Sequence, residues 1–147
     1  MADSGASPLH PRTFDCVVVT PEDTLLETDA TFVALPLFDG ELGIAPLHSP
    51  MIGRLGYGEM RVTDFEGVTH RFYVDGGFVQ VADDRVSVLT GRAILAGAID
   101  AADAADRLST AYEQVAHGDE QIALRQKQLE QARAQVRVAR RAAVPSQ

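Results

Sequence analysis

The chain has 147 residues, enough for one ordinary domain or for a small domain with an appendage. Apolar residues make up 46% of it, so it can bury a core, and its formal charge of −8 argues against nucleic-acid or anionic-lipid partners, which require a basic surface. The single cysteine excludes an internal disulfide and a zinc site built from cysteines. No apolar run reaches the roughly 20 residues that span a bilayer, and the first dozen residues lack a signal-peptide pattern. We therefore expect a soluble acidic protein of cytoplasmic type.

Charge and composition both change near residue 92. Residues 1–91 hold 14 acidic and 5 basic groups, whereas residues 92–147 hold 7 and 8. Ten of the 12 glycines lie in the first part, and the second part is rich in Ala, Gln and Arg, which helices tolerate or favour. The sequence predicts a disordered extension over residues 1–12, a β-rich body over 13–96, and a helical hairpin with a short frayed end over 97–147.

Short segments with strand signals follow one another through the body. Asp39-Gly40 and Asp83-Asp84 are typical of tight turns between strands. Three glycines within segment 52–63 predict bends, bulges or an interruption there. The expected strands cover residues 13–19, 31–35, 41–45, 52–63, 68–74, 78–81 and 85–90. Many short strands joined by turns favour an antiparallel sandwich or barrel.

Two helices are expected after residue 98. Asp100 fits the N-cap of the first helix, with Asp103 as its capping partner. Gly118 suits the left-handed position after that helix, and Asp119 fits the cap of a second helix over about 119–143. Thin apolar stripes would pack the pair: Leu108, Tyr112 and Val115 on the first helix, and Ile122, Leu129, Ala132, Val136 and Ala139 on the second. Because such stripes bury little surface, the hairpin should be marginal alone and need the body or a partner.

Candidate chemical groups do not assemble into a catalytic pattern. The four histidines lack metal-ligand spacing, and the apolar neighbours of Cys16 on its strand face favour a buried structural thiol. Segment 75–77 (DGG) lacks the lysine and the following helix of a phosphate loop, which favours a turn or bulge. Asp100, Asp103 and Asp106 compensate a helix dipole, with a divalent-metal site as the weaker alternative. A binding or coupling protein is therefore favoured over an enzyme.

Residues 40–50 (GELGIAPLHSP) resemble the motif GELGI.PGHAP of the epsilon subunit of bacterial F-type ATP synthases. Other family segments follow in the same order: VTPE at 19–22, YVDGGFVQV at 73–81, RVSVLT at 85–90, ID at 99–100 and HGD at 117–119. The resemblance covers about residues 13–143. It implies an N-terminal antiparallel β-sandwich of about ten strands, followed by a C-terminal antiparallel α-helical hairpin.

The resemblance also implies a function. Such a chain is a non-catalytic rotor subunit in the central stalk of a proton- or sodium-translocating synthase, peripheral at the cytoplasmic face of the bacterial inner membrane. Its sandwich links the γ subunit to the c-ring, and its hairpin folds down or extends along γ toward the α/β catalytic hexamer, where it impedes ATP hydrolysis. Neither nucleic-acid binding nor direct membrane insertion is expected. The alternative is a stand-alone β-sandwich binding module that dimerises through its helical hairpin.

Individual positions carry further expectations by resemblance. Glu41 and His48 match family residues in loops that face the c-ring, and the loop is shaped by Leu42, Gly43 and Pro46. Leu47 stands where the family usually has glycine, and its Cβ disfavours a positive φ, so a different loop path is expected.

The basic end of the second helix is the candidate inhibitory contact to the catalytic hexamer, formed by Arg133, Arg137, Arg140 and Arg141. The residues alone allow a solvated helix face there, or a site for phosphate or a carboxylate-rich partner. Some family members bind ATP through an (I/L)DxxRA motif. Here residues 99–104 read IDAADA, and a carboxylate at Asp103, in place of the arginine, would repel phosphate. We expect no ATP binding, no other cofactor and no metal.

Overall fold

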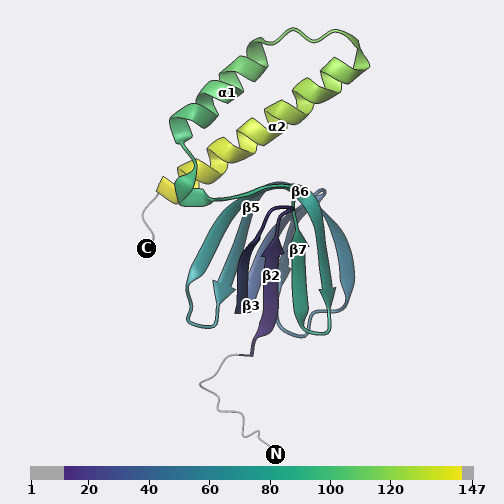
Figure 1. The fold of residues 1–147 in the computed structure, drawn as a ribbon, viewed down its shortest axis with the longest axis vertical. Helices are drawn as coiled ribbons and strands as arrows, with labels where there is room; N and C mark the ends of the chain where they lie inside the picture. The colour runs from purple at the N-terminus through teal and green to yellow at the C-terminus, as the bar shows by residue number, and fades with distance from the viewer. Residues whose placement is uncertain (1–11, 144–147) are drawn as a thin grey trace, which may run out of the picture.

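The computed structural model describes residues 12–143 as a β-domain followed by two helices (Figure 1). Apart from Arg12, the expected N-terminal extension lies outside the described residues, and so does the expected frayed end at 144–147. The strands are β2 (Phe14–Val19), β3 (Thr24–Leu37), β4 (Gly40–Ile44), β5 (Met51–Asp64), β6 (Thr69–Ala82), β7 (Arg85–Leu89) and β8 (Ala93–Leu95). A 3-10 turn over Ala96–Ala98 leads to α1 (Ala101–Glu113) and α2 (Gly118–Ala143).

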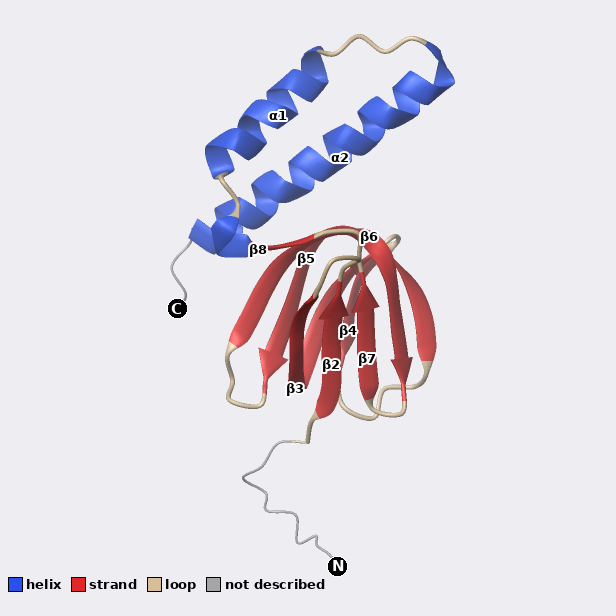
Figure 2. Cartoon of the chain, viewed as in Figure 1, coloured by secondary structure: helices blue, strands red, loops and turns tan. Residues whose placement is uncertain are grey.

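The strands close on themselves, as the ring of arrows in Figure 2 shows. β2 pairs with both β3 and β7, and the path continues from β7 through β6 and β5 back to β3. The expected β-sandwich with a C-terminal helical pair is therefore confirmed. Two details differ from the prediction. The described residues form seven strands instead of about ten. In addition, β2 and β7 start at the same end of the ring and pair in parallel.

The strand count is lower because long strands continue where the sequence predicted ends. β3, β5 and β6 have 14 residues each. β3 runs through Pro36, which pairs with Glu41 of β4, and its register against β5 shifts between Ala34 and Leu37. Proline has no N–H to give to a strand ladder, so it is tolerated at such an irregularity. The prediction that this strand ends at Pro36 was wrong for that reason.

β6 also runs unbroken through segment 75–77, where a turn or bulge was predicted. Its pairing with β5 keeps one register from Val74 to Phe78. Gly76 and Gly77 have φ of +74° and +110°, and a Cβ at Gly77 would lie 2.0 Å from the carbonyl oxygen of Leu89. Glycine is required here because β6 passes close to the end of β7 while changing partners from β8 to β7.

The interior of the ring is the main core. Sixteen buried side chains from β2 to β7 form one apolar cluster. Cys16 belongs to it and is fully buried, as expected for a structural thiol, and burial raises its pKa to about 12. The β-domain therefore has a complete core without the helices.

The start of α1 follows the sequence but its end does not, and α2 begins at Gly118, so Asp119 lies in its first turn and not at the predicted cap position. The carboxylate of Asp100 accepts from the N–H of Asp103 at 3.0 Å, which confirms the predicted cap. α1 stops at Glu113, before the predicted break at 117–119. It can end there because Arg125 of α2 donates to the carbonyl oxygens of Tyr112 and Gln114, which satisfies the C-terminal end of α1.

The packing stripe of α1 was also mispredicted. Tyr112 and Val115 are exposed, and the buried positions are Ala104 and Ala111, with Leu108 half-buried. Small side chains let α1 approach α2 closely. On α2 the predicted stripe is buried from Leu129 onward, whereas Ile122 is exposed. The N-terminal part of α2 thus carries apolar side chains without cover from the described chain.

Candidate functional site

The segment expected to contact a partner begins at β4. Gly40, with φ of +142°, ends the turn after β3, and Glu41 follows as an exposed carboxylate. Leu42 is half-buried and packs against the main core. Gly43 faces the ring of Phe32, and a Cβ there would lie 2.8 Å from it. Glu41 therefore presents a charge to the outside, whereas Leu42 and Gly43 hold the strand in place.

The loop after β4 carries the other predicted contacts. Pro46 and His48 are half-buried, and the Nδ1 of His48 donates to the carbonyl oxygen of Ser49 at 2.8 Å. Leu47 has φ of +65°, and its N–H donates to the carboxylate of Asp84 at 3.0 Å. The loop therefore keeps the left-handed conformation that glycine would favour, and the prediction that Leu47 excludes a positive φ was wrong. The hydrogen bond to Asp84 holds this residue in that conformation.

The structure separates Glu41 from His48. Glu41 lies at the start of β4, beside β5, whereas His48 lies beyond the end of β4, near the turn that holds Asp84. The two predicted contact residues therefore lie at opposite ends of β4 and do not form one cluster.

The four arginines of α2 have different surroundings. Arg133 lies over the ring of Tyr112, 5.3 Å from its centre, and donates to the hydroxyl at 2.7 and 3.1 Å. Arg137 lines a groove of about 700 Å³ between α2, the end of β3 and the middle of β5 and β6. Arg141 pairs with Glu59 of β5 at 3.4 Å. Arg140 is exposed, so half of the predicted contacts are already engaged within the chain.

A small interface holds α2 on the β-domain. Its apolar part consists of Tyr73, Ala96, Ala134 and Val138, with Tyr57, Ile94 and Ile99 at its margin. Beside it, the carboxylate of Asp75 accepts from the hydroxyl of Tyr73 and from the amide of Gln131, both at 2.9 Å. Burial raises the pKa of Tyr73, and the neighbouring Asp75 adds to the rise, so its hydroxyl stays a donor.

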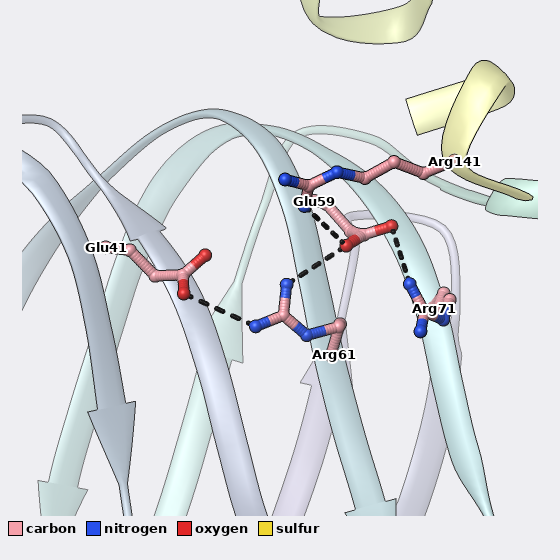
Figure 3. A network of polar contacts seen from close by, with 5 residues as sticks. All are labelled: Glu41, Glu59, Arg61, Arg71 and Arg141. Carbon is pink, nitrogen blue, oxygen red and sulfur yellow. Dashed lines mark hydrogen bonds and ion pairs between the residues drawn. The ribbon is translucent and has the colours of Figure 1, made fainter. Parts of the chain in front are cut away.

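The second polar contact of α2 is an ion-pair network centred on Glu59 (Figure 3). Glu59 is buried on β5, and its carboxylate lies 3.1 Å from Arg61, 3.5 Å from Arg71 and 3.4 Å from Arg141. Arg61 also contacts Glu41, at 3.3 Å. The network therefore joins β4, β5, β6 and the end of α2.

The alternative metal site is not assembled. Asp100 caps α1, and Asp103 pairs with Arg107 at 3.4 Å. Among residues 12–143, no group of three or more His, Cys, Asp or Glu side chains has the arrangement of a metal site. No helix in that part of the chain has the length and apolarity needed to cross a bilayer.

Sequence reasoning missed the residues that fasten the two domains. Asp75 was noted as part of a turn, and Glu59, Tyr73 and Gln131 were not singled out. One local signal could have indicated Glu59: it is an acidic residue two positions before Arg61, on a strand that is otherwise largely apolar or small. Its link to Arg141 spans 82 positions of the chain, so no local pattern indicates it.

A closed β-domain with its own core bears a helical hairpin on a small interface that is partly apolar and partly polar, an arrangement that suits a coupling or binding protein. The sequence model of the family described as "ATP synthase, Delta/Epsilon chain, beta-sandwich domain" matches residues 13–96. The ATP synthase epsilon chain of Rhodopirellula baltica is 49% identical over 125 residues, which cover 85% of this chain and 97% of that protein. The sodium ion specific epsilon chain of Propionigenium modestum is 32% identical over 129 residues, covering 86% and 93%.

The fold has also been seen in a solved structure. A chain of the mitochondrial ATP synthase of Euglena gracilis, from a complex of OSCP, F1 and c-ring, superposes with a TM-score of 0.78 at 20% identity, covering 97% of this chain and 88% of that one. The chain described here belongs to the family of ATP synthase epsilon chains. It is a non-catalytic subunit of an F-type ATP synthase, and the predicted family is confirmed.

Proposed function

We propose that the chain is a rotor subunit whose sandwich links the γ subunit to the c-ring, while its hairpin acts as a mobile inhibitor of ATP hydrolysis. The observation that carries the proposal is the difference between the two cores. Sixteen buried side chains hold the sandwich together, whereas four hold the hairpin to it. An element docked by so few contacts can have a second position within a few kcal/mol of the first.

On the rotor side, the proposed contacts are Glu41, Leu42, Gly43, Pro46 and His48. Glu41 offers a charge to a basic partner group, and the loop around His48 offers a second contact at the other end of β4. With these contacts the subunit would lie at the cytoplasmic face of the bacterial membrane, coupled to either protons or sodium ions. The relative from Propionigenium modestum is named as a sodium ion specific epsilon chain.

On the catalytic side, the proposed contacts are Arg133, Arg137, Arg140 and Arg141. Guanidinium groups pair strongly with carboxylates, so an acidic segment of the catalytic hexamer is the partner that fits them. Arg141 is engaged with Glu59 in the docked hairpin, so its release would accompany undocking, whereas Arg133 is held by Tyr112 of α1 and would be released only if α1 and α2 separate. Arg140 is exposed in the docked state as well, so undocking would add Arg141 to a basic surface that is already in part available.

The test compares the full chain with a chain ending at Leu95, which keeps β2 to β8. Each is co-expressed with the γ subunit of the same genome, and binding is read by size exclusion and ATP hydrolysis after α and β are added. Binding of both chains to γ, with inhibition by the full chain alone, is the expected result. Failure of both to bind γ would contradict the proposal, and a homodimer lost on truncation would support the stand-alone module.

A variant with all four arginines changed to alanine isolates the basic end of α2. We expect weaker inhibition of ATP hydrolysis with γ binding intact, because the sandwich is untouched. Lys127→Ala, which removes an exposed cation from the same helix, is the matched control and should inhibit like the wild type. Equal inhibition by the quadruple variant and the wild type would rule out the arginines as the inhibitory contact.

We also propose that the hairpin holds no nucleotide. The cleft between α1, α2 and Arg92 has a volume of about 280 Å³, at the lower limit of ordinary ligand sites. Its two arginines already face carboxylates: Arg107 lies 3.4 Å from Asp103, and Arg92 lies 3.9 Å from Asp75. Titration calorimetry with ATP should give no specific binding heat, and saturable binding at one site would overturn this expectation.

A further inference from the structure

The buried carboxylate of Glu59 has several cationic neighbours, and one of them belongs to the hairpin. Its side chain is 5% exposed, and three arginines from three elements surround it: Arg61 of β5, Arg71 of β6 and Arg141 of α2. A buried carboxylate is costly unless cations and hydrogen bonds compensate it. Figure 3 shows all three guanidinium groups directed at this one group.

Two of these arginines use the same oxygen. The Oε1 atom of Glu59 accepts from Arg61 at 3.1 Å and from Arg141 at 3.4 Å. The Oε2 atom, within the described chain, has no hydrogen-bond partner and faces Arg71 at the longer distance of 3.5 Å. The attraction of Arg141 to Glu59 therefore depends on how much of Oε1 is already engaged by Arg61.

Arg61 in turn is divided between two carboxylates. One of its terminal nitrogens donates to Glu59 and the other to Glu41, at 3.3 Å. Glu41 is more than half exposed on β4, so a group outside the chain can reach it. If Glu41 were neutralised, Arg61 would pair with Glu59 and no longer with Glu41. The positive electrostatic potential around Arg141 would also rise. Both effects weaken the hold on Arg141.

We propose that Glu41, Arg61 and Glu59 form an ionic relay that sets how tightly the end of α2 stays docked on the sandwich. A cationic side chain of a partner that binds Glu41 would loosen Arg141 at the other end of the relay. The arrival of such a partner at β4 rests on the proposed function, whereas the relay is a property of the chain alone. Binding at β4 and release of the helix end thereby become coupled.

The relay is tested in the full chain without partners, by hydrogen exchange of the α2 amides of residues 134–139. The readout is the ratio of these exchange rates to those of β2 amides, which removes any change in the stability of the sandwich. Arg141→Gln should raise the ratio roughly 2- to 5-fold, the effect of losing a partly exposed ion pair. Arg140→Gln removes the same charge from the neighbouring exposed position and should leave the ratio within about 1.5-fold of the wild type.

Glu41→Gln tests the far end of the relay. It should raise the ratio in the same direction as Arg141→Gln, though less, and it should have no further effect when Arg141 is already glutamine. An unchanged ratio in Glu41→Gln, or an equal rise in both backgrounds, would overturn the relay. Equal effects of Arg141→Gln and Arg140→Gln would overturn the role of Glu59 as the docking point. Since no partner is present, these outcomes do not depend on the γ-binding experiment.

Discussion

The sandwich and the hairpin of this chain are stabilised in different ways. The sandwich closes a ring of strands around sixteen buried side chains, so its stability is its own. The helices pack through alanines at Ala104 and Ala111. The interface of α2 with the sandwich has four buried side chains, of which α2 contributes Ala134 and Val138, and two polar contacts. The comparison supports the proposal that the sandwich is the platform and the hairpin a docked element that separates from it.

The largest effect is expected in the sandwich. Leu35 of β3 is fully buried in the main core, so Leu35→Ala leaves a cavity and should lower the free energy of unfolding by about 2–5 kcal/mol. Urea denaturation followed by circular dichroism measures the change. A loss below about 1 kcal/mol would mean that the ring does not depend on this core.

A smaller effect is expected at the hairpin interface. Val138→Ala removes two buried methyl groups and should cost roughly 1–2 kcal/mol of docking free energy. Hydrogen exchange should then speed up along α2, while exchange in β2 and β6 stays as in the wild type. Equal acceleration in both regions would show that helices and sandwich unfold as one unit.

The loop after β4 offers a stabilising change. Leu47→Gly removes the steric cost of a positive φ, about 1–2 kcal/mol, and gains chain entropy in the unfolded state, about 0.4–1 kcal/mol. The unfolded-state term opposes the relief of strain, so the net expectation is a gain of roughly 0.5–1 kcal/mol in the free energy of unfolding, since Leu47 is exposed and buries little. Thermal unfolding of the variant at a fixed pH measures it, and a lower melting temperature would contradict the account.

The smallest effect is a change in pH dependence within the sandwich. The hydrogen bond from His70 to the Asp64 carboxylate, together with the N–H groups of Val68 and Glu66, lowers the pKa of Asp64. Its contribution to stability is fully present above the ordinary aspartate pKa of about 3.9 and is lost as the pH falls through the lower pKa of the folded state. Urea midpoints between pH 6 and pH 3 should therefore fall more steeply in the wild type than in Asp64→Asn. Identical slopes would exclude this carboxylate as the cause.

Much of the fold could be predicted from local sequence signals. The turn at Asp39-Gly40, the cap at Asp100 and the strand after Asp83-Asp84 depend on a few neighbouring residues, and each is found where it was expected. The long strands were divided wrongly because Pro36 and Gly76 are typical of strand ends. The irregular pairing of β3 and the close approach of β6 to β7, which tertiary packing creates, let both strands continue.

The candidate site was less accessible to sequence reasoning. The resemblance indicated Glu41 and the arginines, and the charges of those residues were visible in the sequence. That Arg141 docks on Glu59, or that Gln131 reaches Asp75, depends on where the hairpin lies against the sandwich. Contacts between residues 56 or 82 positions apart cannot be derived from periodicity or spacing.

The most direct test of the central claim is native-state hydrogen exchange of the wild-type full chain, resolved by residue, at increasing low concentrations of urea. The account predicts that amides in the last turns of α2 open with a lower free energy than amides of β2 and β6, so the hairpin undocks while the sandwich stays folded. One common opening free energy for α2 and the sandwich strands would contradict it, and would make the hairpin a fixed part of a single cooperative domain.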